Sequence, residues 1–376
     1  MSHSIADLEQ RARRYLPRVL YDWIAGGAED EIGLRSSTRI YTEHRLVPRY
    51  GRAVTTPNLA TRLFGRTYGR PFGIAPTGYT GLCRPGGESM LRAAAARVDI
   101  PYVLSGVSVP SLEAIAAEEP GRSWFQVYPA RDHAITLDIV RRARDAGYAT
   151  LVVTMDMPKE AKRERDWRNG FSLPLRFNLQ RLVDGMTHPA WALRFLATGG
   201  LPTLGTWQAY LPAGTAPMEV LRFHTEQGYP VVTWEHLADF RALWPGQMVV
   251  KGLLHPDDVA TALRIGADGV ILSNHGGRQL DRAPTTLEML PRVREKVGPT
   301  VPIMLDGGIR RGSDIAIALA LGADFVFCGR AILWGVIADA RAGADQAIDI
   351  LTDELVRVMC QTGTDSVRAF TRDSLL

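Results

Sequence analysis

The sequence predicts a (β/α)8 barrel from three features: the number of buried strands, the helical segments between them, and the polar residues at the strand ends. Eight short apolar runs lie between residues 72 and 328, and helix-period segments follow most of them. A chain of 376 residues is a common length for such a barrel as one domain. A doubly wound open sheet is the rival fold, but no Gly-x-Gly-x-x-Gly opens a helix after the first strand.

A helical N-terminal segment precedes the barrel. Residues 5–25 carry apolar side chains three to four positions apart, and Pro17 interrupts them. Gly26-Gly27 ends this segment, and the acidic residues that follow indicate a new helix start. The predicted strands are Phe72–Ala75, Tyr102–Ser105, Trp124–Tyr128, Thr150–Thr154, Gln247–Lys251, Gly269–Ser273, Val301–Leu305 and Phe325–Cys328. The clearest helices between them are Glu88–Arg97, Ala134–Ala146, Pro256–Ile265 and Ser313–Leu321.

The connection between the fourth and fifth strands is much longer than one helix. It covers residues 158–246 of the single domain 1–376, and its middle, 171–216, is rich in Trp, Phe, Leu, Pro and Gly with little periodicity. Loops this long are usually functional or mobile. Three roles stay open: a lid, a contact with a membrane surface or partner, or a local core. The side chains that suggest these roles are Trp191, Leu193, Phe195 and Leu201.

Composition excludes several classes of function. The net charge is +4 and the arginines are scattered, so nucleic acid is not an expected partner. Cys83, Cys328 and Cys360 are odd in number and far apart, which suits neither disulfides nor a metal site and indicates a reducing, cytoplasmic location. The first residues lack a signal-peptide pattern, and no run of 18 apolar residues predicts a membrane span.

The C-terminal ends of the strands of such a barrel open on one face, so their residues belong to one site. The sixth strand ends in Ser273-Asn274-His275-Gly276-Gly277-Arg278, which places a base near a cation that can grip a carboxylate. A lone His-x-x-Arg pair is more often a solvated loop. Here, however, the other ends are polar too, with Thr77, Ser105, Gln126, Tyr128, Thr154, Asp156, Lys251, Asp306 and Arg330.

Glycine loops after the last two strands predict a phosphate site. Gly307-Gly308-Ile309-Arg310 and Gly329-Arg330 expose backbone N–H groups beside positive charge. Thr77, Ser105, Gln126 and Thr154 offer neutral hydrogen bonds to a polar heterocycle, and Lys251 suits a ring that becomes anionic. FMN meets these requirements.

The remaining charged strand ends suit a small acid as substrate. Arg278 and Arg163 would hold its carboxylate, and Tyr128 would donate a hydrogen bond. His275 would act as base, with Asp156 stabilising the imidazolium. Arg163 lies in the charge run 159–166, whose default interpretation is a solvated helix.

Two motifs, Ser-Asn-His-Gly-Gly-Arg-Gln-Leu-Asp at 273–281 and Asp-Gly-Gly-Ile-Arg-Arg-Gly at 306–312, resemble the FMN-dependent 2-hydroxy acid dehydrogenases and oxidases. This family includes glycolate oxidase, L-lactate dehydrogenase, mandelate dehydrogenase and the flavin domain of flavocytochrome b2, and the resemblance covers essentially the whole chain. It implies oxidation of an (S)-2-hydroxy acid to the 2-oxo acid, with quinone, oxygen or another acceptor. It implies His275 as base with Asp156 as partner, and Arg278, Arg163 and Tyr128 at the substrate. The FMN-binding residues that it implies are Pro76, Thr77, Gly78, Ser105, Gln126, Tyr128, Thr154, Lys251, Ser273, Asp306, Gly307, Gly308, Ile309, Arg310, Gly329 and Arg330.

The resemblance also bears on partners. Segment 171–216 is similar to the insertion of bacterial membrane-associated lactate and mandelate dehydrogenases, which implies peripheral contact with the cytoplasmic membrane face and electron transfer to quinone. The family is often tetrameric, so a homotetramer is expected.

The chain departs from the family pattern at two positions. Trp23 stands where the family has a tyrosine whose hydroxyl binds the substrate carboxylate. This leaves oxidation of a compound without a free carboxylate, an ester or amide, as an alternative. Gly78 stands where the oxidases carry Ala, which favours an acceptor other than oxygen over an oxygen-using oxidase. A barrel isomerase acting on a diphosphate lacks a further phosphate site, and retention of His275, Asp156 and Arg278 disfavours a non-catalytic flavin protein.

Overall fold

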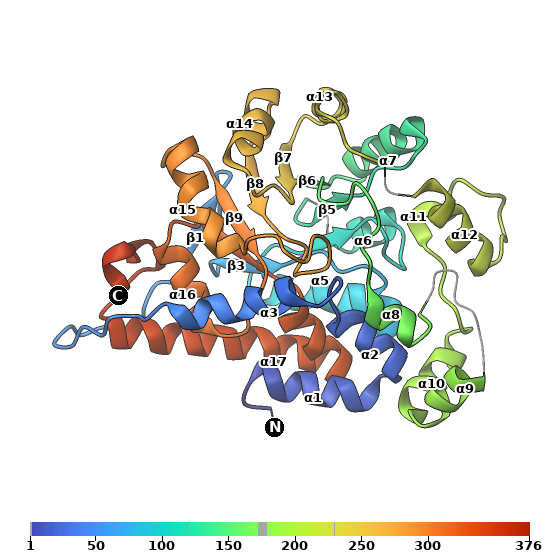
Figure 1. Cartoon of the computed structure of the whole chain (residues 1–376), viewed down its shortest axis with the longest axis horizontal. Helices are drawn as coiled ribbons and strands as arrows, with labels where there is room; N and C mark the ends of the chain where they lie inside the picture. The colour runs from blue at the N-terminus through green and yellow to red at the C-terminus, as the bar shows by residue number, and fades with distance from the viewer. Residues whose placement is uncertain (1, 120, 172–178, 229) are drawn as a thin grey trace.

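The computed structural model describes residues 2–119, 121–171, 179–228 and 230–376, with backbone only for 179–182. Its centre is a parallel sheet of eight strands in the order β3-β10-β9-β8-β7-β6-β5-β4 (Figure 1). A parallel bridge between Ile74 and Tyr102 joins the two edge strands, so the sheet closes into a barrel. The predicted (β/α)8 barrel is confirmed, and the open sheet is excluded. The strands are β3 (Phe72–Ile74), β4 (Val103–Ser105), β5 (Trp124–Val127), β6 (Thr150–Thr154), β7 (Gln247–Lys251), β8 (Gly269–Leu272), β9 (Ile303–Asp306) and β10 (Phe325–Cys328).

The largest boundary error falls on β9, which was predicted as Val301–Leu305. Pro302 has no N–H to donate to a neighbouring strand, so the ladder begins at Ile303, opposite Val270. The same strand continues to Asp306, which pairs with Phe327 of β10. Asp306 is therefore part of the sheet, and its carboxylate has a fixed direction at the C-terminal end of the barrel.

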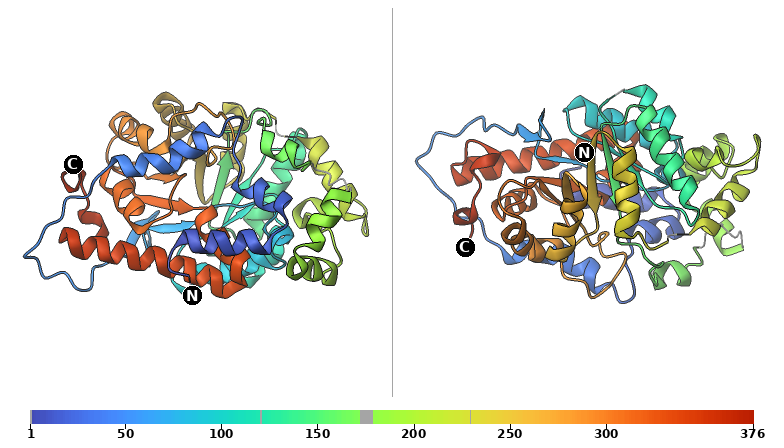
Figure 2. Two further views of the ribbon diagram at one scale, coloured as in Figure 1. Left: turned by 60° about the horizontal axis from the view of Figure 1, so that its bottom comes forward. Right: turned by 90° about the horizontal axis from the view of Figure 1, so that it is seen from above.

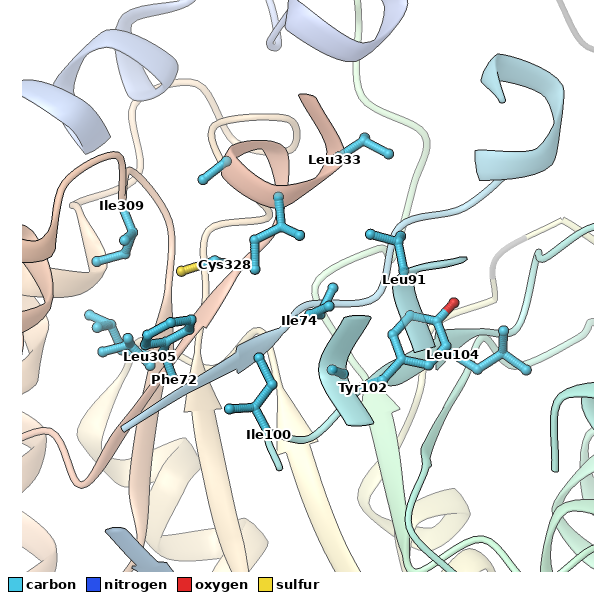
Figure 3. Close-up of a cluster of buried hydrophobic side chains, with 14 of the residues drawn as sticks. Phe72, Ile74, Leu91, Ile100, Tyr102, Leu104, Leu305, Ile309, Cys328 and Leu333 are labelled. Carbon is cyan, nitrogen blue, oxygen red and sulfur yellow. The ribbon is translucent and has the colours of Figure 1, made fainter. Parts of the chain in front are cut away.

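Helices between the strands form the outer layer. They include α4 (Thr80–Cys83), α5 (Gly87–Arg97), α6 (Leu112–Glu118), α7 (His133–Asp145), α14 (Pro256–Ile265), α15 (Thr286–Val297), α16 (Gly312–Ala320) and α17 (Arg330–Thr362). Their apolar faces pack on the barrel; Figure 3 shows this core around β3, where Phe72, Ile74, Leu91 and Leu305 are at most 1% exposed. The side chain of Leu91 comes from α5 and Leu305 from β9, so one cluster joins sheet and helix.

The N-terminal segment forms two helices, as predicted. They are α1 (Ile5–Tyr15) and α2 (Arg18–Ala25), with the break at Pro17. A capping box between Ser4 and Asp7 starts α1, which lies along α17 (Figures 1 and 2). After α2 the chain turns through 26–31 into α3 (Ile32–Arg39) and a short 3-10 helix (Ile40–Glu43), so α2 ends above the C-terminal ends of the strands.

A hairpin closes the N-terminal end of the barrel. Its strands are β1 (Thr61–Leu63) and β2 (Arg66–Tyr68), and Leu63 and Tyr68 join the apolar cluster inside the barrel. Trp124 belongs to this cluster and donates its indole N–H to the hydroxyl of Tyr68 at 3.3 Å. The barrel interior is thus packed at this end, and the cavity described below lies at the other.

The long connection 158–246 divides into two unequal parts. It contains α8 (Glu164–Arg168), α9 (Leu179–Met186), α10 (Pro189–Ala197), α11 (Gly205–Gln208), α12 (Pro217–Gln227) and α13 (Trp234–Leu243). The middle showed little periodicity in the sequence because its helices, of four to nine residues, are too short to show a clear period.

The hairpin α9–α10 projects from the body (Figures 1 and 2). Hydrogen bonds attach it to the body: the carboxylate of Asp184 accepts from Arg18 N (3.0 Å) and Val19 N (3.2 Å), and Trp191 donates to Leu82 O at 3.1 Å. Of the four side chains that suggested a role for this segment, Trp191, Phe195 and Leu201 pack against the core, whereas Leu193 is 68% exposed.

The part that follows, α11–α12, is built into the barrel. Trp207 is 2% exposed and donates its indole N–H to Gly106 O at 2.9 Å, in the loop after β4. Thr206 accepts a hydrogen bond from Leu112 N at 3.1 Å. These contacts fix α11 against α6 and the loop after β4. Of the three predicted roles, a local core therefore describes this part.

Candidate active site

One cavity of about 550 Å³ lies at the C-terminal ends of the barrel strands. The walls come from most strand ends, from α2, and from the segment between β6 and α8. Sixteen of the residues predicted from the sequence line it: Trp23, Pro76, Thr77, Gly78, Tyr128, Arg163, Lys251, His275, Arg278, Asp306, Gly307, Gly308, Ile309, Arg310, Gly329 and Arg330. The other predicted site residues, Ser105, Gln126, Thr154, Asp156 and Ser273, are not in the lining of this cavity and lie behind it.

His275 and Asp156 form a largely buried pair, with side chains 18% and 10% exposed. The imidazole Nδ1 lies 3.1 and 3.2 Å from the two carboxylate oxygens of Asp156, and Nε2 lies 3.3 Å from the hydroxyl of Tyr128. His275 adopts φ +56, a left-handed conformation that is rare outside glycine, and its N–H donates to the Ser273 hydroxyl at 3.0 Å. The backbone of the loop thereby aims the ring across the cavity mouth.

The charge states of this pair follow from burial. Burial lowers the pKa of His275, and the attraction of Asp156 offsets only part of that effect. Burial raises the pKa of Asp156, but the proximity of His275 and Lys251 outweighs it, so the net pKa is below the ordinary value. At neutral pH the pair is a neutral imidazole beside a carboxylate, which is the state of a base ready to accept a proton.

Gly252 gives Asp156 its place. This glycine follows β7 with φ +103, and a Cβ there would lie 2.6 Å from both Cβ and Cγ of Asp156. A side chain at this position would push the carboxylate away from His275. Sequence reasoning missed Gly252, although its position next to Lys251 at a strand end was a usable signal.

Arg278 is held by the end of α2. Its Nη1 donates to the carbonyl oxygens of Trp23 (2.7 Å) and Gly26 (2.9 Å). Burial lowers the pKa of Arg278 well below the usual range, and repulsion by Arg163 and Arg330 adds to it. In addition, Nε of Arg163 is buried and has no hydrogen-bond partner among the residues that the structure describes. Two arginines thus face one cavity with hydrogen-bonding capacity left for an anion.

Trp23 serves as an apolar wall. Its ring stacks on Phe171 (centroids 5.1 Å apart, interplanar angle 21°) and meets Tyr79 edge-on at 5.9 Å. The guanidinium carbon of Arg278 lies 5.9 Å from the same ring. Trp23 thus binds Arg278 through its carbonyl oxygen and lines the cavity with its ring.

A chain of hydrogen bonds lies behind the cavity. The hydroxyl of Ser105 donates to Gln126 Oε1 at 3.2 Å, and Gln126 Nε2 donates to the hydroxyl of Thr154 at 3.0 Å. All three residues are at most 2% exposed. They were predicted to meet a heterocycle directly; in this structure they orient one another across three neighbouring strands.

The other end of the cavity is strongly cationic. Lys251 lies 3.0 Å from Asp306 Oδ2 and donates to Ser273 Oγ at 2.7 Å. Burial acts to lower the pKa of Lys251, but Asp306 and Asp156 reverse the effect and raise it. Burial lowers the pKa of Arg330 to about 9, with a further contribution from Arg310.

Arg310 and Arg330 fit a phosphate. Burial also lowers the pKa of Arg310, and among the described residues no carboxylate lies within 4 Å of either guanidinium group. Arg330 donates instead to main-chain carbonyls of Ile24 and Gly26. Next to them, a Cβ on Gly329 would meet only Ala75, at 3.8 Å. An open glycine cradle beside two cations matches a phosphorylated cofactor, and Asp306 Oδ1, buried with no hydrogen-bond partner in the described part of the chain, is available to a donor of that cofactor.

The fold and this cavity define a class: a barrel enzyme that holds a phosphorylated cofactor beside an anionic substrate and a buried His–Asp base. The family model for FMN-dependent dehydrogenase matches residues 12–376. The chain therefore belongs to the FMN-dependent dehydrogenases, oxidoreductases that act on CH–OH groups with FMN as cofactor.

Relatives and solved structures agree with this assignment. A putative L-lactate dehydrogenase of Mycobacterium tuberculosis is 39% identical over 95% of this chain and 84% of its own. The (S)-mandelate dehydrogenase of Pseudomonas putida is 36% identical over 99% of this chain and 93% of its own. The crystal structure of a monotopic membrane protein, (S)-mandelate dehydrogenase, aligns with a TM-score of 0.95 at 36% identity, covering 100% of this chain and 99% of that one.

The structure adds site residues that sequence reasoning missed. Met157, Tyr79, Phe171 and His224 line the cavity, as does Asp166. The charge run 159–166 was interpreted as a solvated helix, which was wrong at its end, because Asp166 is 6% exposed and only residues from Glu164 onward are helical. No signal in the sequence distinguishes Asp166 from the other charged residues of this run.

Proposed function

We propose that the protein oxidises an (S)-2-hydroxy acid to the corresponding 2-oxo acid. One arrangement carries the proposal: Arg163 and Arg278, with unused hydrogen-bonding capacity, face the same cavity as the His275–Asp156 pair. Bound FMN would supply the acceptor for the two electrons that leave the substrate. Side chains of the protein itself would bind the substrate carboxylate and accept the proton.

His275 takes the substrate proton. The neutral imidazole accepts it at Nε2, the nitrogen that faces Tyr128 and the cavity, while Asp156 at Nδ1 stabilises the cation that forms. Both routes of oxidation, removal of the Cα proton or of the hydroxyl proton, place this proton on the same nitrogen. Arg163 and Arg278 fix the carboxylate so that Cα meets the base in one orientation.

FMN would be held by the cationic half of the cavity. Arg310, Arg330 and the glycines of 307–308 and 329 would bind its phosphate, and Lys251 would lie near the ring. Pro76, Thr77 and Gly78 line the same cavity and would also contact FMN. The supporting observation is that Arg310 and Arg330 line this end of the cavity and that neither guanidinium group has a carboxylate within 4 Å among the described residues.

The test is anaerobic bleaching of the holoenzyme flavin by a panel of compounds. The panel pairs each 2-hydroxy acid with its amide and its methyl ester, because Trp23 lacks the hydroxyl of a tyrosine. Bleaching by acids is the expected result. Bleaching by the neutral partners alone would favour the ester or amide alternative, and no bleaching by any compound would refute the proposal.

We propose, further, that α9–α10 rests on a membrane surface and that the electron acceptor is a quinone. None of the described helices is long and apolar enough to cross a bilayer. The hairpin nevertheless exposes four large apolar side chains: Val183 (50%), Met186 (68%), Leu193 (68%) and Leu196 (70%). Such a cluster on a projecting element is typical of a lipid or protein contact.

Vesicle flotation tests this contact. Leu193→Asp with Leu196→Asp should abolish co-flotation with lipid vesicles while FMN content stays normal. Tyr50→Asp is the matched control, because Tyr50 is 80% exposed on the loop before β1, far along the chain from the hairpin. Timed reoxidation of reduced enzyme by a soluble quinone and by air distinguishes quinone from oxygen, and flotation that survives the double variant would exclude this surface. The location on the cytoplasmic membrane face and the homotetramer stay proposals from family resemblance; light scattering measures the latter.

A further inference from the structure

Asp166 is a buried acid that the proposed reaction does not use. It lies in the first turn of α8, is 6% exposed, and lines the cavity together with Arg163 and Arg278. Its backbone oxygen accepts a hydrogen bond from Phe171 N at 2.8 Å, which fixes the turn that carries the carboxylate. The side chain therefore faces the region where the substrate carboxylate is expected.

The surrounding charges come from three elements. Arg163 and Arg165 both precede it, as the N-cap and in the first turn of α8, Arg278 follows β8, and Asp22 belongs to α2. Arg165 is engaged elsewhere, since it pairs with Glu31 and lies 3.7 Å from Asp22. Within the described part of the chain, no basic group approaches the Asp166 carboxylate within 4 Å. Burial raises the pKa of Asp166 to about 6, against the attraction of Arg278, Arg163 and Arg165.

A substrate carboxylate would bring a second negative charge to the same arginines. At short range inside a protein, like charges destabilise each other, so a bound anion favours the protonated form of a neighbouring acid. Linkage makes the effect mutual: the proton must strengthen anion binding by the same factor by which the anion strengthens proton binding.

We infer that Asp166 is a positioning residue that sets the strength of the carboxylate grip: it takes up a proton when a 2-hydroxy carboxylate binds to the neighbouring arginines and returns it when the 2-oxo carboxylate leaves. This inference rests on the proposed function of the same site. Its consequence is that the enzyme releases its anionic product more readily as the pH rises.

The sign follows from the direction of proton uptake. Below about pH 6 Asp166 is already protonated in the free enzyme, so anion binding is strongest there. As pH rises, binding must include proton uptake, and the dissociation constant increases by up to about tenfold per pH unit. It levels off once the pH exceeds the pKa of Asp166 in the complex.

The experiment measures ligand binding by the change in flavin absorbance of the holoenzyme between pH 5.5 and 8.5. The probe is 2-hydroxyisobutyrate, which has the carboxylate and hydroxyl but no Cα hydrogen to lose. In the wild type its dissociation constant should rise with pH, and in Asp166→Asn it should stay at the low, acid-side value. The neutral amide of the same probe should show no slope that depends on Asp166. Glu160→Gln, at an exposed acid lining the same cavity, is the matched control and should keep the wild-type slope.

Two further measurements make the result decisive. A pH indicator in weak buffer should report uptake of up to one proton per site when the probe binds to wild-type enzyme at pH 7, and no uptake in Asp166→Asn or Asp166→Ser. His275→Gln should retain the uptake, which separates Asp166 from the catalytic imidazole. Absence of uptake in the wild type, an unchanged slope in Asp166→Asn, or weakening by one factor at every pH would overturn the inference.

Failure of this inference can be told apart from failure of the proposed function. If no 2-hydroxy acid bleaches the flavin but proton uptake with the probe depends on Asp166, the function fails and the inference stands. If bleaching occurs without such uptake, the reverse holds.

Discussion

The two ends of the cavity differ in how the chain satisfies its own charges. At the cofactor end, Lys251 already has Asp306 at 3.0 Å and the hydroxyl of Ser273 at 2.7 Å. At the substrate end, Nε of Arg163 has no partner and Asp166 has no basic group within 4 Å among the described residues. The fold therefore neutralises Lys251 at the cofactor end, where Arg310 and Arg330 remain for an anionic group, whereas at the substrate end Arg163 keeps a donor available for a bound anion.

Replacement of the base should separate the two ends most clearly. His275→Gln removes the proton acceptor but keeps a polar side chain, so flavin reduction by substrate should slow by roughly 10²–10⁴-fold. FMN content should not change, because His275 belongs to the substrate end. Stopped-flow absorbance under anaerobic conditions measures the rate, and His255→Gln, at an exposed histidine that precedes α14 and does not line the cavity, should leave it unchanged. Undiminished reduction would show that another group accepts the proton.

A substitution at the cofactor end should have the opposite profile. Arg310→Gln removes a buried cation that has no carboxylate partner, and FMN affinity should fall by roughly 10- to 100-fold, as expected for one charge-assisted hydrogen bond. Fluorescence titration of the apoprotein with FMN measures this loss. Arg311→Gln is the control, since Arg311 is 52% exposed and pairs with Glu354. Equal losses in both variants would mean that the effect is general and that Arg310 does not bind the phosphate.

The smallest of these effects concerns the link between the two ends. Gly252→Ala places a Cβ against Asp156 and should move its carboxylate away from His275, which we expect to slow flavin reduction about tenfold with FMN retained. Gly298→Ala has a similar positive φ (+83) but meets nothing within 4 Å, so it reports backbone strain alone. Strain at such positions costs about 1 kcal/mol of stability. If both variants reduce flavin at the same rate, Gly252 has no role in placing Asp156.

The barrel and most of its site were predictable from the sequence because their signals are local. Short buried strands appear as apolar runs, and a parallel barrel brings all their C-terminal ends to one face. Hence Lys251, His275 and Arg310 could be assigned to one site although they lie far apart in the chain. Strands β6, β7 and β10 fall at the predicted residues, since no proline interrupts them.

The rest depends on contacts between segments that are distant in sequence. Nothing in residues 159–166 marks Asp166 as the buried member of a charged run; its burial depends on the packing of α8 against α2. Arg278 was predicted to grip a substrate carboxylate, and the sequence did not show that carbonyls at the end of α2 also occupy one of its nitrogens. The long connection likewise divides into a projecting hairpin and a part fixed to the barrel because Trp207 donates to Gly106 O, far away in the sequence.

The attachment of the hairpin has a consequence for engineering. Helix α2 begins after Pro17 without a side-chain cap of its own, and the carboxylate of Asp184 on α9 accepts from its first two N–H groups. A variant that lacks the hairpin α9–α10, made to improve solubility, would also lose the cap of α2. The other end of α2 holds Arg278. Asp184→Ala alone should lower the free energy of unfolding by about 1 kcal/mol, which chemical denaturation can measure against Asp184→Asn, since asparagine also caps helices. Any replacement for the hairpin must therefore bring its own hydrogen-bond acceptor to the start of α2.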